Sequence, residues 1–180
     1  GTPDAKSQKL IEASPNFNGK VFINLEPTID MVKDNPQASM LNYVPQALFP
    51  LKGKLPKCPL PNLKFYANAL KNGEFIWLGH VSLICKLDGK TIVTDPVLHR
   101  AFPLPLGGKP FTYEHAITAS DYPEVIDIAL ISHDHYDHLD YKTILELKDR
   151  IAKFLVPLGV KAHLVKWGVN EGKIYEFDWF

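Results

Sequence analysis

The sequence has no excess of charge of either sign, few cysteines and no long apolar run. Lysine plus arginine and aspartate plus glutamate each number 20, so the formal net charge is zero and no electrostatic feature favours nucleic acid as a partner. No apolar run approaches the roughly 20 residues that a bilayer-spanning helix needs. With 180 residues and 46% apolar composition, the chain has the size of about one globular domain.

The two cysteines, Cys58 and Cys85, lie among apolar residues or prolines and form no CxxC pair. We expect both to be small buried hydrophobic side chains. A disulfide between them would need an oxidising compartment and a geometry that the sequence does not reveal. The cysteines therefore decide little about function.

Prolines divide the chain into two regions. Residues 43–62 contain five prolines, a density that excludes a central strand or a helix interior and indicates an extended segment that wraps a domain. We therefore divide the chain into an N-terminal extension with this proline-rich segment, residues 1–64, and a regular domain, residues 65–180. Within the extension we expect one short strand, over 21–23, and otherwise a polar stretch with little regular pattern.

Strand and helix patterns alternate in the second region. We expect strands over 75–78, 81–87, 91–94, 125–131, 154–156 and 174–180. We expect helices over 141–150, capped by Asp140, and over 160–167, ended by Gly168. The pair Asp88-Gly89 predicts a tight hairpin, and the continuous apolar run 125–131 predicts a strand covered on both faces. The order strand, helix, strand, helix, strand indicates a layered α/β fold.

Residues 132–140, SHDHYDHLD, carry the clearest chemical signal. His133 and His135 are two residues apart, so in extended chain they point to one side, and Asp137 and His138 follow in the turn that enters the helix. Imidazole and carboxylate together suit zinc, iron or manganese, and the lack of thiolate argues against a closed structural zinc site. An unpaired charged cluster at the end of a buried strand would be costly, and a metal ion supplies the missing partner.

The spacing His-x-His-x-Asp-His resembles the signature of the metallo-β-lactamase-fold hydrolases. Flanking stretches extend the resemblance to the subgroup that contains N-acyl-phosphatidylethanolamine phospholipase D and its bacterial relatives. The stretches that carry it are 14–17, 24–28, 77–80, 94–97, 107–110 and 135–140.

The resemblance implies an αββα sandwich with two metal ions in a cleft at its edge. Carried over to this chain, His133 and His135 bind the first ion, and Asp137 and His138 bind the second. We expect zinc, two ions in the complete site, with iron or manganese as alternatives. In such sites a metal-bound hydroxide attacks the substrate ester.

We assign catalytic roles to Asp137, His80 and Asp95. Asp95 ends a predicted strand and is placed to orient a ligand histidine, although an aspartate before a proline is equally typical of a turn. His80 follows Gly79 between two strands, where it either lines the cleft or is simply a turn histidine.

The chain departs from the family pattern because it stops at residue 180, before the remaining metal ligands of the family. After His138 the only histidine is His163, within a predicted amphipathic helix. We therefore expect only the N-terminal half of the sandwich, completed by a longer chain or by another copy, or else a remnant. Half a sandwich would expose one apolar sheet face, which predicts pairing or aggregation.

These expectations combine into a metal-dependent hydrolase of a small-molecule or lipid phosphodiester. The alternatives are a sugar-phosphate lactonase of the same fold, or an inactive half-domain that binds metal weakly. The first residue is Gly1 rather than methionine, which indicates a tag remnant or a trimmed precursor. Removal of an upstream anchor would make the protein membrane-associated or periplasmic; without one we expect a cytoplasmic protein.

Overall fold

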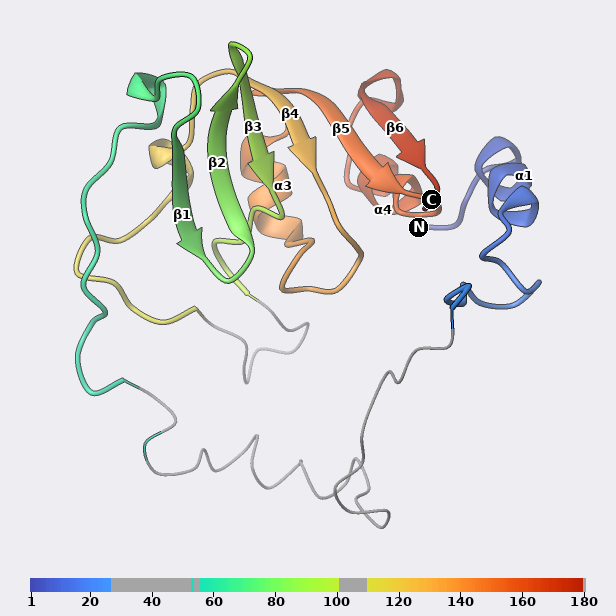
Figure 1. Ribbon diagram of the computed structural model, residues 1–180, viewed down its shortest axis with the longest axis horizontal. Helices are drawn as coiled ribbons and strands as arrows, with labels where there is room; N and C mark the ends of the chain where they lie inside the picture. Colours follow the sequence, from blue (N-terminus) through green and yellow to red (C-terminus); the bar gives the residue numbers. More distant parts are fainter. Residues whose placement is uncertain (27–52, 54–55, 101–109, 180) are drawn as a thin grey trace.

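The described part of the chain forms one mixed six-stranded sheet with two helices packed on one face (Figure 1). The computed structural model describes residues 1–26, 53, 56–100 and 110–179. The strands follow chain order across the sheet and are β1 (Phe75–Gly79), β2 (Ser82–Leu87), β3 (Lys90–Thr94), β4 (Ile126–Leu130), β5 (Ile151–Pro157) and β6 (Ile174–Phe177). The helices are α1 (Ala5–Ala13), α3 (Tyr141–Leu147) and α4 (Lys161–Lys166), with 3₁₀ turns η2 (Ala67–Ala69), η3 (Ala119–Asp121) and η4 (Glu171–Lys173).

Strands β1, β2 and β3 form an antiparallel meander, and the hairpin between β2 and β3 is the one that the sequence predicts. The turn between β2 and β3 consists of Asp88 and Gly89, and both have positive φ, 47° and 73°. This is the backbone conformation of the two-residue turn that the pair Asp-Gly favours, because it follows the right-handed twist of the strands.

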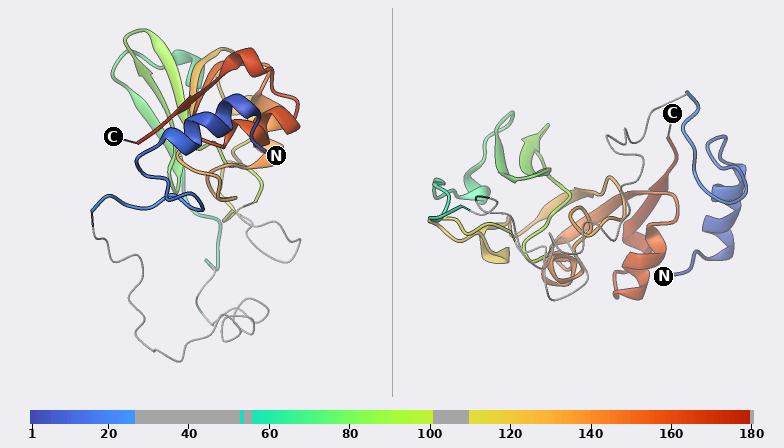
Figure 2. Two further views of the ribbon diagram at one scale, coloured as in Figure 1. Left: turned by 90° about the vertical axis from the view of Figure 1, so that its right-hand side faces the viewer. Right: turned by 90° about the horizontal axis from the view of Figure 1, so that it is seen from below.

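Strands β3 to β6 run parallel, and α3 and α4 form the crossovers of two βαβ units. Both helices lie behind the sheet in Figure 1, and the view from below in Figure 2 places them together on one side. The predicted helix signals are confirmed: the Asp140 carboxylate accepts a hydrogen bond from the backbone N–H of Lys142, and Gly168 follows α4 with a φ of 80°.

The core lies between the sheet and these two helices. A row of side chains crosses the sheet through Ile84, Val93, Ala129 and Phe154, which pair with one another in register and are each 0% exposed. The helices contribute Ile144, Leu147 and Leu164 to the same core. This apolar layer holds the carboxyl ends of β3 and β4 in a fixed position relative to α3.

The opposite face of the sheet is also apolar but is not covered by the described helices. The neighbouring row runs from Trp77 through Leu83, Thr94, Leu130 and Leu155 to Tyr175. Trp77 is 65%, Leu130 38% and Tyr175 43% exposed. The prediction that β4 is covered on both faces is therefore wrong within the described residues, because α3 and α4 both pack on one side.

The N-terminal segment differs from its prediction. Helix α1, which was not expected, is capped by Asp4, whose carboxylate accepts hydrogen bonds from the backbone N–H groups of Lys6 and Ser7. Only Ser7 and Ile11 of α1 are buried, so the helix has no apolar stripe for sequence analysis to detect. It lies beyond the β6 edge of the sheet (Figures 1 and 2), where the Ser7 hydroxyl donates to the Glu176 carboxylate.

The strand expected over 21–23 is wrong, because these residues fold back on their own chain. The structure has only an isolated bridge between Phe17 and Phe22. The side chain of Asn18 accepts a hydrogen bond from the backbone N–H of Val21, at 2.9 Å, and closes a tight loop. The ring of Phe22 packs against Trp179 with centroids 5.7 Å apart, so the loop is anchored to the end of the described chain.

The expectation for the cysteines is wrong for Cys58 and only partly met for Cys85. Cys58 is exposed, Cys85 is half-buried, and neither forms a disulfide. Cys58 lies in a proline-rich surface segment, whose residue Leu60 pairs with Tyr113 through a single parallel bridge. Prolines limit the backbone hydrogen bonds that would draw this segment into a sheet interior.

Several expectations lie outside the described residues. These include the proline positions Pro45 and Pro50, the end of the 24–28 stretch and residues 107–109 of the stretch 107–110. The domain boundary at residue 64 stays a prediction. Among the helices that the structure describes, none has the length and apolar character to cross a bilayer.

A carboxylate beside the pairing of β3 with β4 should make the stability of the protein depend on pH. Asp127 accepts hydrogen bonds from the Lys90 ammonium and from the backbone N–H of Thr91, both at 2.9 Å, and these hold the pKa of its carboxyl below the ordinary value. Because the folded pKa is lowered, this stabilisation is present above about pH 4 and is lost as the pH falls through the folded pKa.

Asp127→Asn should therefore lower the free energy of unfolding by about 1 kcal/mol near neutral pH, and the difference from wild type should shrink as the pH falls below about 4 and through the folded pKa. Urea unfolding at several pH values measures both quantities. Asp149→Asn, at an exposed position, is the matched control. A difference from wild type that is the same in acid as at neutral pH would contradict the assignment.

Candidate metal centre

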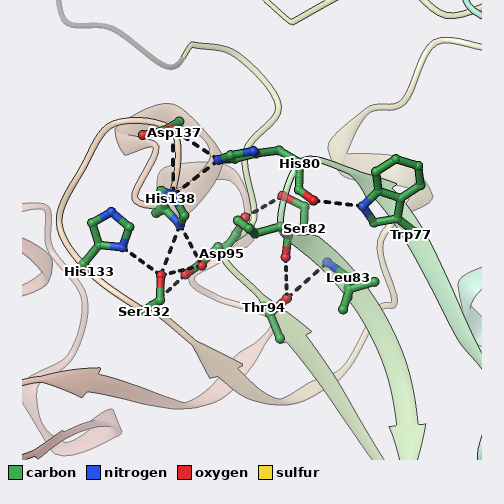
Figure 3. A network of polar contacts seen from close by, with 11 residues as sticks. Trp77, His80, Ser82, Leu83, Thr94, Asp95, Ser132, His133, Asp137 and His138 are labelled. Atoms are coloured by element: carbon green, nitrogen blue, oxygen red, sulfur yellow. Dashed lines mark hydrogen bonds and ion pairs between the residues drawn. The ribbon is translucent and has the colours of Figure 1, made fainter. Parts of the chain in front are cut away.

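The predicted site residues gather at the edge of the sheet where β1, β3 and β4 end (Figure 3). β3 and β4 are parallel, so the residues that follow them meet at the same edge, and the backbone N–H of Asp95 donates to the carbonyl of Leu130 at 2.9 Å. β1 also ends here, and the turn that follows it carries His80. Segments far apart in sequence are thus brought together by strand pairing.

Two side-chain hydrogen bonds tie the His80 turn to the end of β3. The Thr94 hydroxyl donates to the carbonyl of Val81 at 2.8 Å, and the Ser82 hydroxyl donates to the carbonyl of Asp95 at 2.5 Å. His80 and Asp95 both have positive φ, 48° and 36°, a conformation that is uncommon for residues other than glycine. Their backbones are held in this region by the surrounding contacts, as often happens at functional sites.

Asp95 is a buried carboxylate, 4% exposed, at the centre of a hydrogen-bond network. One oxygen accepts the backbone N–H of Ser132 at 2.7 Å. The other accepts the Ser132 hydroxyl at 2.6 Å and lies 2.9 Å from Nδ1 of His138. A carboxylate only accepts, so Nδ1 of His138 carries the proton and its Nε2 keeps a lone pair.

Three side chains each offer one potential ligand atom, and these atoms all lie within 4.8 Å of one another: His80, Asp137 and His138. Nε2 of His80 lies 3.2 Å from Oδ2 of Asp137 and 3.3 Å from Nε2 of His138. The third separation, from Oδ2 of Asp137 to Nε2 of His138, is 3.7 Å.

Two of these separations fit the edges of a metal coordination tetrahedron, and the third, 3.7 Å, is longer than such an edge. Ligand bonds of 2.0–2.1 Å at a tetrahedral zinc ion place neighbouring ligand atoms about 3.3–3.4 Å apart. His138 is the most buried of the three, while His80 and Asp137 face solvent. The donor set of two imidazoles and one carboxylate, with one position left for water or substrate, is that of an open site rather than a closed structural one.

The other pair of predicted ligands, His133 and His135, lies beside this group. Their rings are 4.5 Å apart, and the ring of His133 lies 3.8 Å from that of His138. Burial lowers the pKa of His133, and the neighbouring imidazoles of His138 and His135 lower it further. A depressed pKa keeps the imidazole neutral, which is the form that binds a metal.

A cavity of about 450 Å³ opens next to the motif and is lined in part by His135, Asp137, His163 and Trp167. Nε2 of His163 lies 3.8 Å from a carboxylate oxygen of Asp134, which joins α4 to the motif loop. Sequence analysis placed His163 on a helix and gave it no part in the site. No local signal marks it, because only the packing of α4 against the sheet brings it here.

The structure thus brings the six predicted site residues together. Five of them are linked by direct polar or ring contacts: His80, Asp95, His133, Asp137 and His138. The sixth, His135, contacts the ring of His133. The structure adds Ser132, which precedes the first motif histidine and was given no role from sequence. It does not draw His133 and His135 into the three-donor group. The individual roles of all these residues stay predictions.

Comparison with known proteins gives relatives in several organisms. An uncharacterised protein of Mycobacterium tuberculosis is 34% identical over 99% of this chain and 50% of its own length. N-acyl-phosphatidylethanolamine-hydrolyzing phospholipase D 1 of Caenorhabditis elegans is 41% identical over 53% of this chain and 26% of its own. A metal-dependent hydrolase of Hyperthermus butylicus is 32% identical over 46% and 31%. The chain therefore spans about half the length of the mycobacterial relative and less of the others.

Among solved structures, CmlA, a diiron β-hydroxylase from Streptomyces venezuelae, is 31% identical over 57% of this chain and 20% of its own, with a TM-score of 0.45. The model of the β-lactamase superfamily domain matches residues 90–179, which are half of the chain. The match contains β3 to β6, the whole His-x-His-x-Asp-His motif and Asp95. With its mixed sheet and the motif at the sheet edge, the chain belongs to the β-lactamase superfamily.

Proposed function

We propose that this protein is a metal-dependent hydrolase that cleaves a phosphodiester, with zinc as its metal. The observation that carries the proposal is the convergence of the three donor atoms of His80, Asp137 and His138, which lie 3.2–3.7 Å from one another, close to the spacing of tetrahedral ligands. A metal ion held there supplies Lewis acidity and lowers the pKa of bound water. The relatives named as hydrolases support the reaction class.

The residues of this chain would prepare the site before any ion binds. Asp95 holds the proton of His138 on Nδ1, so Nε2 points its lone pair at the other two donors. His133 and His135 are the proposed ligands of a second ion, with further ligands supplied by water or by protein outside the described residues. Iron and manganese have the same preference for imidazole and carboxylate, so they remain the alternatives to zinc.

The substrate is proposed to be a lipid phosphodiester of the N-acyl-phosphatidylethanolamine type, and the protein to act at a membrane surface. The sequence similarity to the Caenorhabditis elegans phospholipase D supports this choice. A sugar-phosphate lactone is the alternative substrate of the same metal chemistry. A half-domain that binds metal weakly without catalysis is the alternative that the small number of converging donors favours.

Zinc binding tests the proposed ligands directly. His80→Ala and His138→Ala should each weaken zinc binding at least about 10-fold, because each removes one of three converging donors. A competition titration with a chromogenic chelator measures the affinity, and plasma mass spectrometry measures the ratio of metal to chain. His115→Ala, which changes an exposed histidine outside the cluster, should leave both unchanged.

Equal zinc affinity in wild type and both cluster variants would overturn the proposed ligand set. A stoichiometry near two with weakened binding in His133→Ala as well would support a second ion.

Hydrolysis tests the reaction and the substrate. The zinc-loaded chain should cleave N-acyl-phosphatidylethanolamine in vesicles or bis(p-nitrophenyl) phosphate, and Asp137→Ala should reduce the rate at least about 100-fold because a ligand is lost. Chelator treatment should abolish the activity, and added zinc should restore it. Product formation is followed by mass spectrometry for the lipid and by absorbance for the nitrophenyl ester.

The pattern of substrates decides between the alternatives. Cleavage of a sugar-phosphate lactone without cleavage of either phosphodiester would replace the proposed substrate by the lactone. A chain that binds zinc tightly and cleaves none of the three would be a metal-binding module rather than an enzyme.

We also propose that the open face of the sheet is an interface, covered by a longer chain or by a second copy. The row from Trp77 to Tyr175 presents apolar side chains on five of the six strands, with Thr94 as the β3 member, and apolar patches of this kind mark interaction surfaces. The relatives of about twice the length support cover by further chain.

The isolated chain should therefore self-associate in a concentration-dependent way. Leu130→Glu, which places a charge in the middle of the open row, should shift the population toward monomer in sedimentation velocity. Val165→Glu, at a similarly exposed position on α4, is the matched control and should leave the distribution unchanged. A strictly monomeric wild-type chain at micromolar concentration would contradict the proposed interface.

A further inference from the structure

The hydroxyl of Ser132 contacts one imidazole from each group of proposed ligands (Figure 3). Its hydroxyl lies 2.6 Å from Oδ2 of Asp95, 2.9 Å from Nδ1 of His133 and 3.1 Å from Nδ1 of His138. The backbone N–H of Ser132 also donates to Asp95, so two bonds fix this residue against the buried carboxylate. The hydroxyl therefore has a fixed position rather than a freely rotating one.

The number of hydrogens in this cluster determines which atom donates to which. A serine hydroxyl has one hydrogen and two lone pairs, and a carboxylate has none to give. The short contact to Asp95 uses the hydroxyl hydrogen, because two oxygens 2.6 Å apart without a proton between them would repel. The hydroxyl then faces the ring of His133 with a lone pair, so Nδ1 of His133 must carry a hydrogen.

We propose that Ser132 is a positioning residue that fixes the tautomer of His133 and so leaves its Nε2 free to bind metal. Asp95 fixes His138 in the same tautomer directly, and it fixes His133 through the Ser132 hydroxyl. One buried carboxylate thereby orients one imidazole from each of the two proposed metal sites. This inference rests on the proposed metal centre for its purpose, but the tautomer itself is a property of the metal-free chain.

The tautomers can be read in the metal-free chain. Long-range ¹H–¹⁵N correlation spectra of protein labelled with ¹⁵N in its histidines show which ring nitrogen carries the hydrogen. Above the pH at which the imidazoles are neutral, wild type should show both His133 and His138 as the Nδ1–H form. A wild-type spectrum with His133 in the Nε2–H form would overturn the proposal without any variant.

Ser132→Ala removes the hydroxyl but keeps Asp95 in contact with His138. His133 should then lose the Nδ1–H form as its major species, while His138 should keep it and serve as the internal reference. Ser132→Thr, which retains a hydroxyl, should restore the wild-type state of His133. An Ala variant with unchanged His133 would also overturn the proposal, and if that variant does not fold, the wild-type and Thr spectra still decide.

Ser82→Ala is the matched control, because the Ser82 hydroxyl contacts Asp95 at its backbone carbonyl and, within the described residues, touches no imidazole. It should leave the tautomers of both histidines unchanged. A loss of the His133 tautomer in this control as well would mean that general loosening around Asp95, and not the Ser132 hydroxyl, sets the ring.

Zinc titration of the same proteins separates this inference from the proposed function. Removing an outer partner of a metal-binding histidine typically costs about 10–100-fold in affinity, so Ser132→Ala should weaken zinc binding by that factor and Ser132→Thr by much less. The expected tautomers in a chain that binds no zinc would refute the metal centre but retain the role of Ser132. Tight zinc binding with the opposite His133 tautomer would refute the role of Ser132 and retain the metal centre.

Discussion

The parallel pairing of β3 with β4 places the buried carboxylate of Asp95 beside Ser132 and His138, and the site depends on this contact. A displacement of β3 by one residue would turn Asp95 to the other face of the sheet and leave the donors of Ser132 and His138 without an acceptor. Unpaired polar groups at such a depth are costly, so the register of the strands and the arrangement of the imidazoles stabilise each other. The apolar row through Val93 and Ala129, buried in the core, fixes the same register.

Local signals in the sequence predict much of the sheet. The Asp88-Gly89 turn, the cap at Asp140 and Gly168 after α4 each act within a few residues, and each is found as expected. The six-residue motif is a local signal as well, since strand geometry and the following turn bring its side chains together. His80 and Asp95 could each be a turn residue or a site residue according to the sequence, and the structure shows that each is both. Each has the backbone conformation of a turn residue and a side chain in the cluster.

The features that sequence analysis missed depend on contacts between distant segments. His163 reaches the motif loop only because α4 packs on the sheet, and helix α1 is held at its sheet edge by polar contacts rather than by an apolar stripe. The apolar run of β4 looks like a strand covered on both faces, yet the described helices cover one face only. The sequence shows that a residue is apolar, but the tertiary fold determines which segment, if any, packs over it.

The left-handed backbone at His80 has a consequence for how this position can change. Glycine adopts a φ of 48° without strain, so replacement of the histidine by glycine would relax the turn while it removes an imidazole from the cluster. Most other side chains would keep the strain and also lose the nitrogen. Backbone stability therefore favours glycine at this position, whereas metal ligation requires the imidazole, so a search for thermostable variants would select against the ligand at residue 80.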